Sequence, residues 1–77
     1  MNSTTIQAAA FHPMRGHVAE GVKVAFPGGT VLTVKATMRG WTLADAHGRQ
    51  QTTPTHDANA LTASIVKIET AAETLVA

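Results

Sequence analysis

Residues 20–45 read EGVKVAFPGGTVLTVKATMRGWTLAD, and this stretch decides the expected fold. Bulky apolar residues alternate with small or charged ones from Val22 to Phe26, which is the period of a half-buried strand. Pro27 and two glycines then interrupt the pattern. They favour a tight reversal, because proline presets φ and glycine permits positive φ. The pattern therefore predicts a strand over 20–26 that ends in a hairpin turn.

Two further strands are predicted after this turn. Residues 30–38 consist largely of β-branched and bulky apolar types, which strands favour. Residues 41–45 form a third short strand, separated from the second by only two residues. Three strands joined by such short turns indicate a meander.

The second half of the chain is expected to complete the sheet. Residues 49–56 are polar and contain Pro54, which makes them an edge or a loop. A short helical turn is expected near 57–62. Residues 64–68 are rich in β-branched apolar side chains and are predicted to form the last strand.

A chain of 77 residues is one domain at most, and three parts are expected in it. Residues 16–69 form a single β domain. Residues 1–15 lack the strand period and form an N-terminal arm or a short helix, which Ser3 would cap. Residues 70–77 have helical propensity but are too few for an isolated helix, so a C-terminal tail or a short helical turn is expected.

The order of these segments over residues 18–69 resembles that of an SH3-like small β-barrel. A tight turn joins the first strand to a longer curved strand, and a short strand headed by Trp41 follows. A polar loop, a helical turn and a closing strand complete the layout. The resemblance implies a mainly β fold, either a small five-stranded barrel or a strongly curled antiparallel sheet. Closure suits a short chain because it hides strand edges.

Composition limits the core and the cellular setting. The hydrophobic fraction is 44%, but alanine supplies much of it. Burial of so few large side chains roughly offsets the conformational entropy that folding costs, so a second subunit or a bound partner is expected to add stability. The absence of cysteine excludes disulfides and thiolate zinc sites. With no apolar run long enough for a membrane span or a secretory signal, we expect a cytoplasmic protein.

The sequence indicates neither catalysis nor a cofactor. Ser3 and Ser64 lack the glycine-flanked elbow of a hydrolase. Residues 27–30 have predicted strands on both sides, whereas a phosphate-binding loop is followed by a helix. We therefore expect a non-catalytic protein.

The four histidines match no known spacing of metal ligands. His12 and His17 are separated by proline and glycine, so no regular helix presents them together. His47 and His56 both lie in predicted loops, which leaves open whether they converge. No metal site is predicted.

Five residues are candidates for partner binding: Lys23, Lys35, Arg39, Trp41 and Arg49. Lys23 and Lys35 lie on the polar faces of neighbouring predicted strands and are able to converge. Trp41 is either a central core residue or an exposed anchor beside Arg39, because tryptophan buries a large area and both residue types dominate interface hot spots.

The function expected first is a protein-binding module, with self-association as one way of binding. Val31, Ile65 and Leu75 would then form a patch that another chain covers. One alternative is a small accessory protein, of the kind that phages and plasmids encode, that inhibits a host defence protein by occupying its binding site. A second is a weak nucleic-acid-binding barrel, although a net charge of +1 with dispersed basic residues does not favour it.

Overall fold

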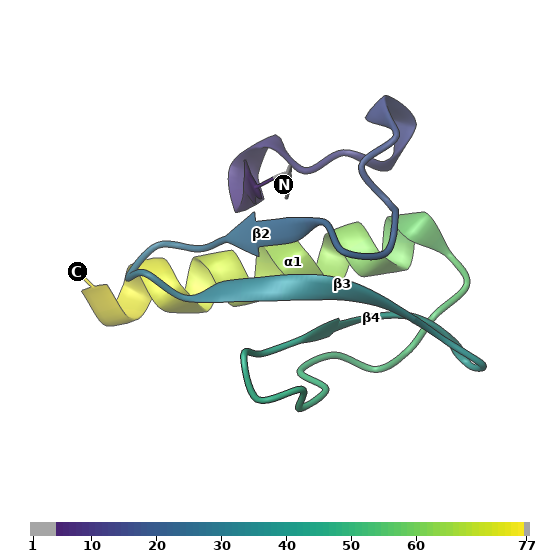
Figure 1. The fold of residues 1–77 in the computed structure, drawn as a ribbon. Coiled ribbons are helices and arrows are strands. Elements are labelled where there is room, and N and C mark those ends of the chain that lie inside the picture. Colours follow the sequence, from purple (N-terminus) through teal and green to yellow (C-terminus); the bar gives the residue numbers. More distant parts are fainter. Residues whose placement is uncertain (1–4, 77) are drawn as a thin grey trace.

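The fold is a mixed sheet with one long helix against it, in a computed structural model that describes residues 5–76. The elements of these residues are β1 (Thr5–Gln7), β2 (Lys23–Ala25), β3 (Val31–Thr37), β4 (Gly40–Ala44) and α1 (Ala58–Val76). Two short 3-10 helices, η1 (Ala8–Ala10) and η2 (Pro13–Arg15), follow β1. Helix α1 runs behind the strands and covers one face of the sheet (Figure 1).

The predicted meander is confirmed by β2, β3 and β4, which pair antiparallel in chain order. The turn between β2 and β3 is closed by the backbone N–H of Phe26, which donates to the carbonyl of Thr30 at 2.8 Å. Gly28 and Gly29 hold φ values of 90° and 94° in this turn. Such values favour glycine, which explains why the two-glycine signal located the reversal.

The polar segment 49–55 forms an irregular edge beside β4. Isolated bridges join Ala44 to Gln50 and Trp41 to Thr55. Between these bridges, the backbone N–H of Leu43 donates to the Thr52 hydroxyl at 3.1 Å instead of to a carbonyl. The segment therefore continues the sheet without becoming a regular strand, in agreement with an edge interrupted by a proline.

The expected five-stranded barrel is wrong, and so is the mainly β class. The sheet has four strands in the described residues and remains open, and the last strand predicted at 64–68 is part of α1. Its β-branched side chains indicated a strand over five residues, but Leu61, Ile65 and Ile68 follow helical spacing and face the core. The fold is therefore mixed α/β.

Helix α1 is long because a cap starts it and no breaker stops it. The Asp57 carboxylate accepts the backbone N–H of Asn59 at 2.9 Å, which is an N-cap contact. No glycine or proline follows up to the end of the chain. The helical turn expected near 57–62 is therefore only the beginning of a helix that includes most of residues 70–77.

The N-terminal part contributes an edge strand and a core side chain. β1 pairs in parallel with β2, with Ile6 opposite Val24. Phe11, directly after η1, is 4% exposed and lies among the core side chains. Ser3, the cap expected for a short helix here, lies outside the described residues.

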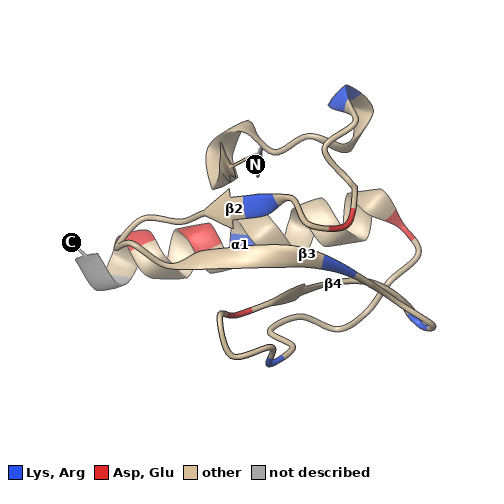
Figure 2. Cartoon of the chain, in the orientation of Figure 1, with Lys and Arg blue, Asp and Glu red and all other residues tan. Residues whose placement is uncertain are grey.

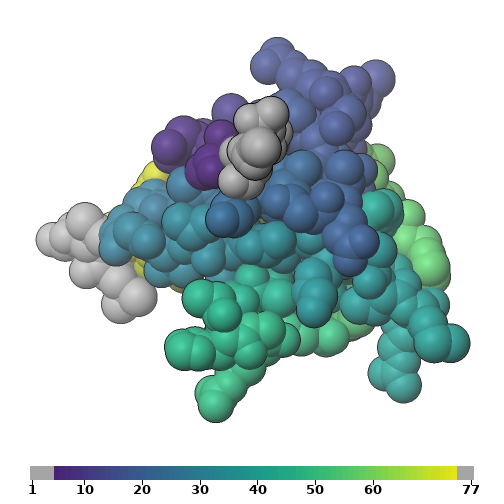
Figure 3. Space-filling model, in the orientation of Figure 1, coloured from purple at the N-terminus to yellow at the C-terminus, as the bar shows by residue number. Residues whose placement is uncertain are grey.

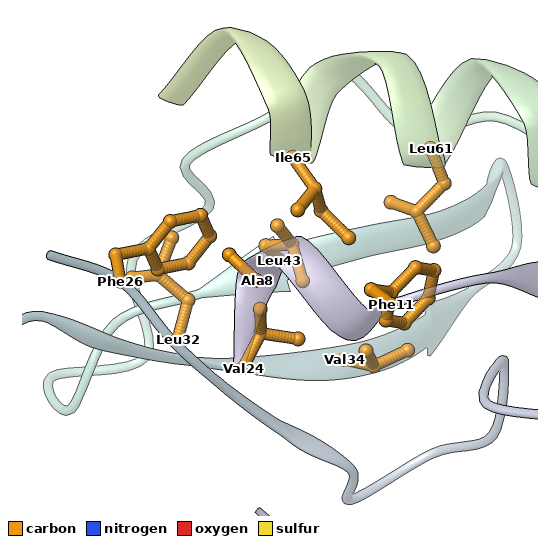
Figure 4. Close-up of a cluster of buried hydrophobic side chains, with 9 residues drawn as sticks. All are labelled: Ala8, Phe11, Val24, Phe26, Leu32, Val34, Leu43, Leu61 and Ile65. Atoms are coloured by element: carbon orange, nitrogen blue, oxygen red, sulfur yellow. The ribbon is translucent and has the colours of Figure 1, made fainter. Parts of the chain in front are cut away.

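The core lies between the sheet and α1, and the N-terminal segment, the strands β2 to β4 and α1 all contribute side chains to it (Figure 4). Its buried members are Ala8, Phe11, Val24, Phe26, Leu32, Val34, Leu43, Leu61 and Ile65. The patch expected from Val31, Ile65 and Leu75 is not formed as predicted, since Ile65 is 0% exposed. The side chain of Leu75 lies outside the described part of the structure.

Candidate functional site

The outer face of the sheet, which points away from α1, carries two of the predicted binding residues. Lys23 is opposite Thr33, and Lys35 lies two residues further along β3. Side chains of opposite residues share a face, as do alternate residues along a strand. The two lysines are therefore diagonal neighbours, with Cβ atoms about 7 Å apart by sheet geometry.

Over β2 and β3, none of residues 5–76 covers the two lysines, and this outer face is basic. Lys23 and Lys35 are both exposed, and the strands of the described residues carry no acidic side chain (Figure 2). Glu20 flanks the face, because the backbone N–H of neighbouring Gly21 donates to the Val34 carbonyl at 2.9 Å. The lysines thus form a small positive area with one carboxylate at its border.

On β4, the outer face of the sheet is covered by the segment that follows the strand. The Thr42 hydroxyl, opposite Lys35 in the register, donates to the Thr52 carbonyl at 2.6 Å and lies 3.0 Å from the Thr52 hydroxyl. Thr42 is consequently 2% exposed. The segment after β4 therefore covers this strand and leaves β2 and β3 free.

The turn between β3 and β4 presents Arg39 and a residue that the sequence analysis did not select, Met38. The Thr37 hydroxyl accepts the Arg39 backbone N–H at 3.1 Å and donates to the Gly40 carbonyl at 2.7 Å. Met38 is 100% exposed and Arg39 is exposed beside it. The sequence analysis placed Met38 at the end of the predicted strand 30–38 and the turn at residues 39–40, so the exposure of Met38 in the loop was not predicted.

Trp41 and Arg49 do not join the outer-face lysines. Trp41 pairs with Ala36, which places it on the helix side, and it packs half-buried against the core. Arg49 lies at the other end of β4 from Arg39, where its carbonyl accepts the Asp45 backbone N–H at 3.0 Å. The tryptophan is thus mainly a packing residue and is not positioned to stack beside the lysines.

The Asp45 carboxylate holds the turn after β4. One oxygen accepts the backbone N–H groups of His47 and Arg49, both at 2.9 Å, and the other accepts the Gln51 side-chain amide at 3.1 Å. The Arg49 contact, followed by that from His47, lowers the pKa of Asp45 because hydrogen bonds favour the charged form. The Asp45 carboxylate therefore stabilises the turn after β4.

The histidines are not gathered into a metal site. His47 follows the end of β4, whereas His56 follows Thr55, which pairs near the start of β4, so these two are kept apart. His17 accepts the backbone N–H of His12 at Nδ1, at 3.3 Å. Within residues 5–76, no three metal-ligating side chains are grouped closely enough to hold an ion.

A groove of about 400 Å³ lies between α1 and the edge segment. Its lining residues are Gln51, Thr52, Thr53, Ser64, Lys67, Ile68 and Ala71. Lys67 supplies the charge in this lining. Sequence reasoning missed the groove because the groove requires residues 64–71 to be helical.

Comparison of the chain with protein-family models, curated proteins and solved structures gave no match. Over the described range, no helix has the length and apolar character that crossing a membrane requires.

Proposed function

We propose that the protein is a non-catalytic protein-binding module whose outer sheet face receives an acidic surface of a partner protein. The observation that carries this proposal is the placement of Lys23 and Lys35. In the part of the chain that the structure describes, they are exposed neighbours on a face whose strands carry no acidic residue. Complementary charge steers association and fixes the orientation of partners.

A protein partner is favoured over a nucleic acid by the small number of positive charges. Proteins held by the phosphate backbone commonly make about 6–10 phosphate contacts. The outer face offers Lys23 and Lys35, with Arg39 at its end. Single-stranded nucleic acid would also need an aromatic platform, and Trp41 lies on the opposite side of the sheet.

Inhibition of a host protein is a special form of the same proposal. A small protein that covers an acidic binding site would block it without any chemistry of its own. The basic face provides the charge that such a contact needs, and the cytoplasm is the proposed location. Self-association stays an additional mode, measured by sedimentation of the purified protein.

The test compares charge reversal on the two faces of the molecule. The protein is used to capture partners from lysate of the cells that encode it, and each captured protein is identified, purified and titrated by calorimetry. We expect the Lys23→Glu/Lys35→Glu variant to weaken binding at least tenfold. The matched control is Lys67→Glu, on α1, which should change the affinity less than twofold.

Two results would overturn the proposal. One is a purified partner that binds the double variant as tightly as the unchanged protein. The other is tight, steeply salt-dependent binding of a defined oligonucleotide without any lysine-dependent protein partner, which would favour the nucleic-acid alternative.

A further inference from the structure

The turn between β3 and β4 presents two large side chains, Met38 and Arg39, at positions where the turn itself does not select them. Thr37 and Gly40 are paired, so Met38 and Arg39 form a two-residue loop. Loops of this length favour glycine, asparagine or aspartate, because their common forms need positive φ. No residue other than glycine has positive φ in the described chain. Both loop residues therefore have negative φ, and Gly40, directly after them, carries the positive φ of 121°, so the backbone of the turn requires neither methionine nor arginine at these positions.

Three sets of contacts hold the residues that flank this loop. The Thr37 hydroxyl bridges the Arg39 N–H and the Gly40 carbonyl. Gly40 has a φ of 121° and lies so close to the Thr55 backbone that a Cβ atom would overlap it. The next residue, Trp41, exchanges two backbone hydrogen bonds with Thr55, at 2.7 and 3.0 Å. A loop held in this way loses little conformational freedom when it binds.

The loop also projects from the body of the molecule. In Figure 3 the surface over residues 37–40 extends at the lower right of the view, beyond the end of the sheet. Met38 is 100% exposed there, so its side chain contributes no burial to the fold. A fully exposed methionine on a rigid turn has its apolar surface available for a partner.

The two side chains are suited to one kind of partner surface. A methionine side chain is unbranched and polarizable, and it fills irregular apolar pockets. The neighbouring Arg39 presents a planar guanidinium that pairs with carboxylates in a bidentate manner. Methionine and arginine are both enriched where protein interfaces are fully buried.

We infer that the Met38–Arg39 turn is the anchor of the binding surface. Met38 enters an apolar pocket of the partner protein, and Arg39 pairs with a carboxylate at the rim of that pocket. This inference rests on the proposed function and names the partner more closely, as a protein with a concave apolar site bordered by acidic residues. Lys35, two residues before Thr37 on the same face, extends the positive charge toward that border.

The first experiment maps the contact in the full-length protein. A photoreactive aliphatic amino acid, a diazirine of about the size and shape of methionine, is placed at position 38 and, in a matched protein, at position 14, where the native methionine is 87% exposed. Both are irradiated in lysate of the encoding cells, and crosslinked proteins are identified. We expect one partner crosslinked from position 38 and not from position 14. Capture alone does not support the inference, so this partner is then purified.

The second experiment measures affinity for the purified partner by calorimetry. Met38→Ala should weaken binding at least tenfold, the size expected of a central anchor, whereas Met14→Ala should change it less than twofold. Thr37→Val should also weaken binding, although it keeps both tip residues, because the turn loses its two side-chain hydrogen bonds. Unchanged unfolding midpoints of Met38→Ala and Met14→Ala confirm that folding is intact.

The outcomes separate the inference from the proposed function. A partner lost by Lys23→Glu/Lys35→Glu but unaffected by Met38→Ala overturns the anchor and leaves the function. A partner lost by Met38→Ala but unaffected by the lysine variant retains the anchor and overturns the outer-face proposal. Absence of any crosslink specific to position 38 overturns the anchor.

Discussion

β3 and β4 are adjacent and paired, yet they are covered very differently. In β4, Gly40, Thr42, Leu43 and Ala44 are buried, since α1 lies on one side and the segment after the strand closes the other. In β3, the three residues 35–37 are exposed. Both strands bury their inner side chains, Leu32 and Val34 in β3 and Leu43 in β4, so the difference lies on the outer face, which is covered over β4 and leaves a surface of β3 free for binding. Substitutions of buried residues and of exposed outer-face residues should therefore have separable effects.

The largest expected effect comes from the core side chain of β4. Leu43→Ala should lower the free energy of unfolding by about 4 kcal/mol, because Leu43 is 0% exposed and its loss leaves a cavity. Val31→Ala, in β3, should cost about 1 kcal/mol or less, because Val31 is already 42% exposed. Urea denaturation followed by Trp41 fluorescence measures both. Equal losses would contradict the difference between the buried inner side chains and the exposed outer ones.

Gly40 should be the next most sensitive position. Gly40→Ala adds overlap with the Thr55 backbone to the strain of a positive φ, and we expect a loss of about 3 kcal/mol. Gly29→Ala is the matched control. Its φ is 94°, but no atom lies within 4 Å of the added Cβ, so strain alone of about 1 kcal/mol is expected. Similar unfolding midpoints of the two variants would show that the contact with Thr55 is unimportant.

A smaller loss is expected from the buried hydroxyl of β4. Thr42→Val keeps the shape but removes the donor to the Thr52 carbonyl, which should cost about 1–2 kcal/mol. Thr33→Val on the open part of the outer face is expected to change the free energy of unfolding by less than about 0.5 kcal/mol. If the two variants unfold at the same urea concentration, the covering segment does not protect β4 as described.

The smallest effect is the pH dependence of the turn after β4. The pKa of Asp45 is lowered in the folded chain, so the charged carboxylate stabilises the fold above the unfolded pKa of about 4. That contribution is lost as the pH falls through the lower folded pKa. The Tm of the unchanged protein should therefore fall more steeply below about pH 4 than that of Asp45→Asn. Parallel Tm curves would exclude a role for this carboxylate.

The meander was predictable because its signals are local. Alternation from Val22 to Phe26 and the two following glycines determine strand and turn within a few residues. Helix α1 was not predictable from the same kind of window, since residues 64–68 favour a strand when considered alone. Its helical character appears only when Leu61, Ile65 and Ile68 are compared across an uninterrupted, capped segment. Packing against the sheet outweighs the local preference.

The candidate surface was predictable in part for the same reason. Alternation was enough to place Lys23 and Lys35 on polar faces. The side of the sheet that Trp41 occupies depends on the register with Ala36, and a shift of one residue would reverse it. The importance of Met38 became visible only through its full exposure and the contacts that fix its turn.

The two margins of the sheet have a consequence for aggregation. β1 is three residues long, and the segment beyond β4 is irregular and contains Pro54. Within residues 5–76, an incoming strand from another copy therefore meets no long regular ladder of free backbone groups at either margin, which disfavours cross-β growth. The short, irregular segments at the two edges thus disfavour pairing of the open sheet with another strand. Association with other proteins then depends on exposed side chains and not on backbone hydrogen bonds at a sheet edge.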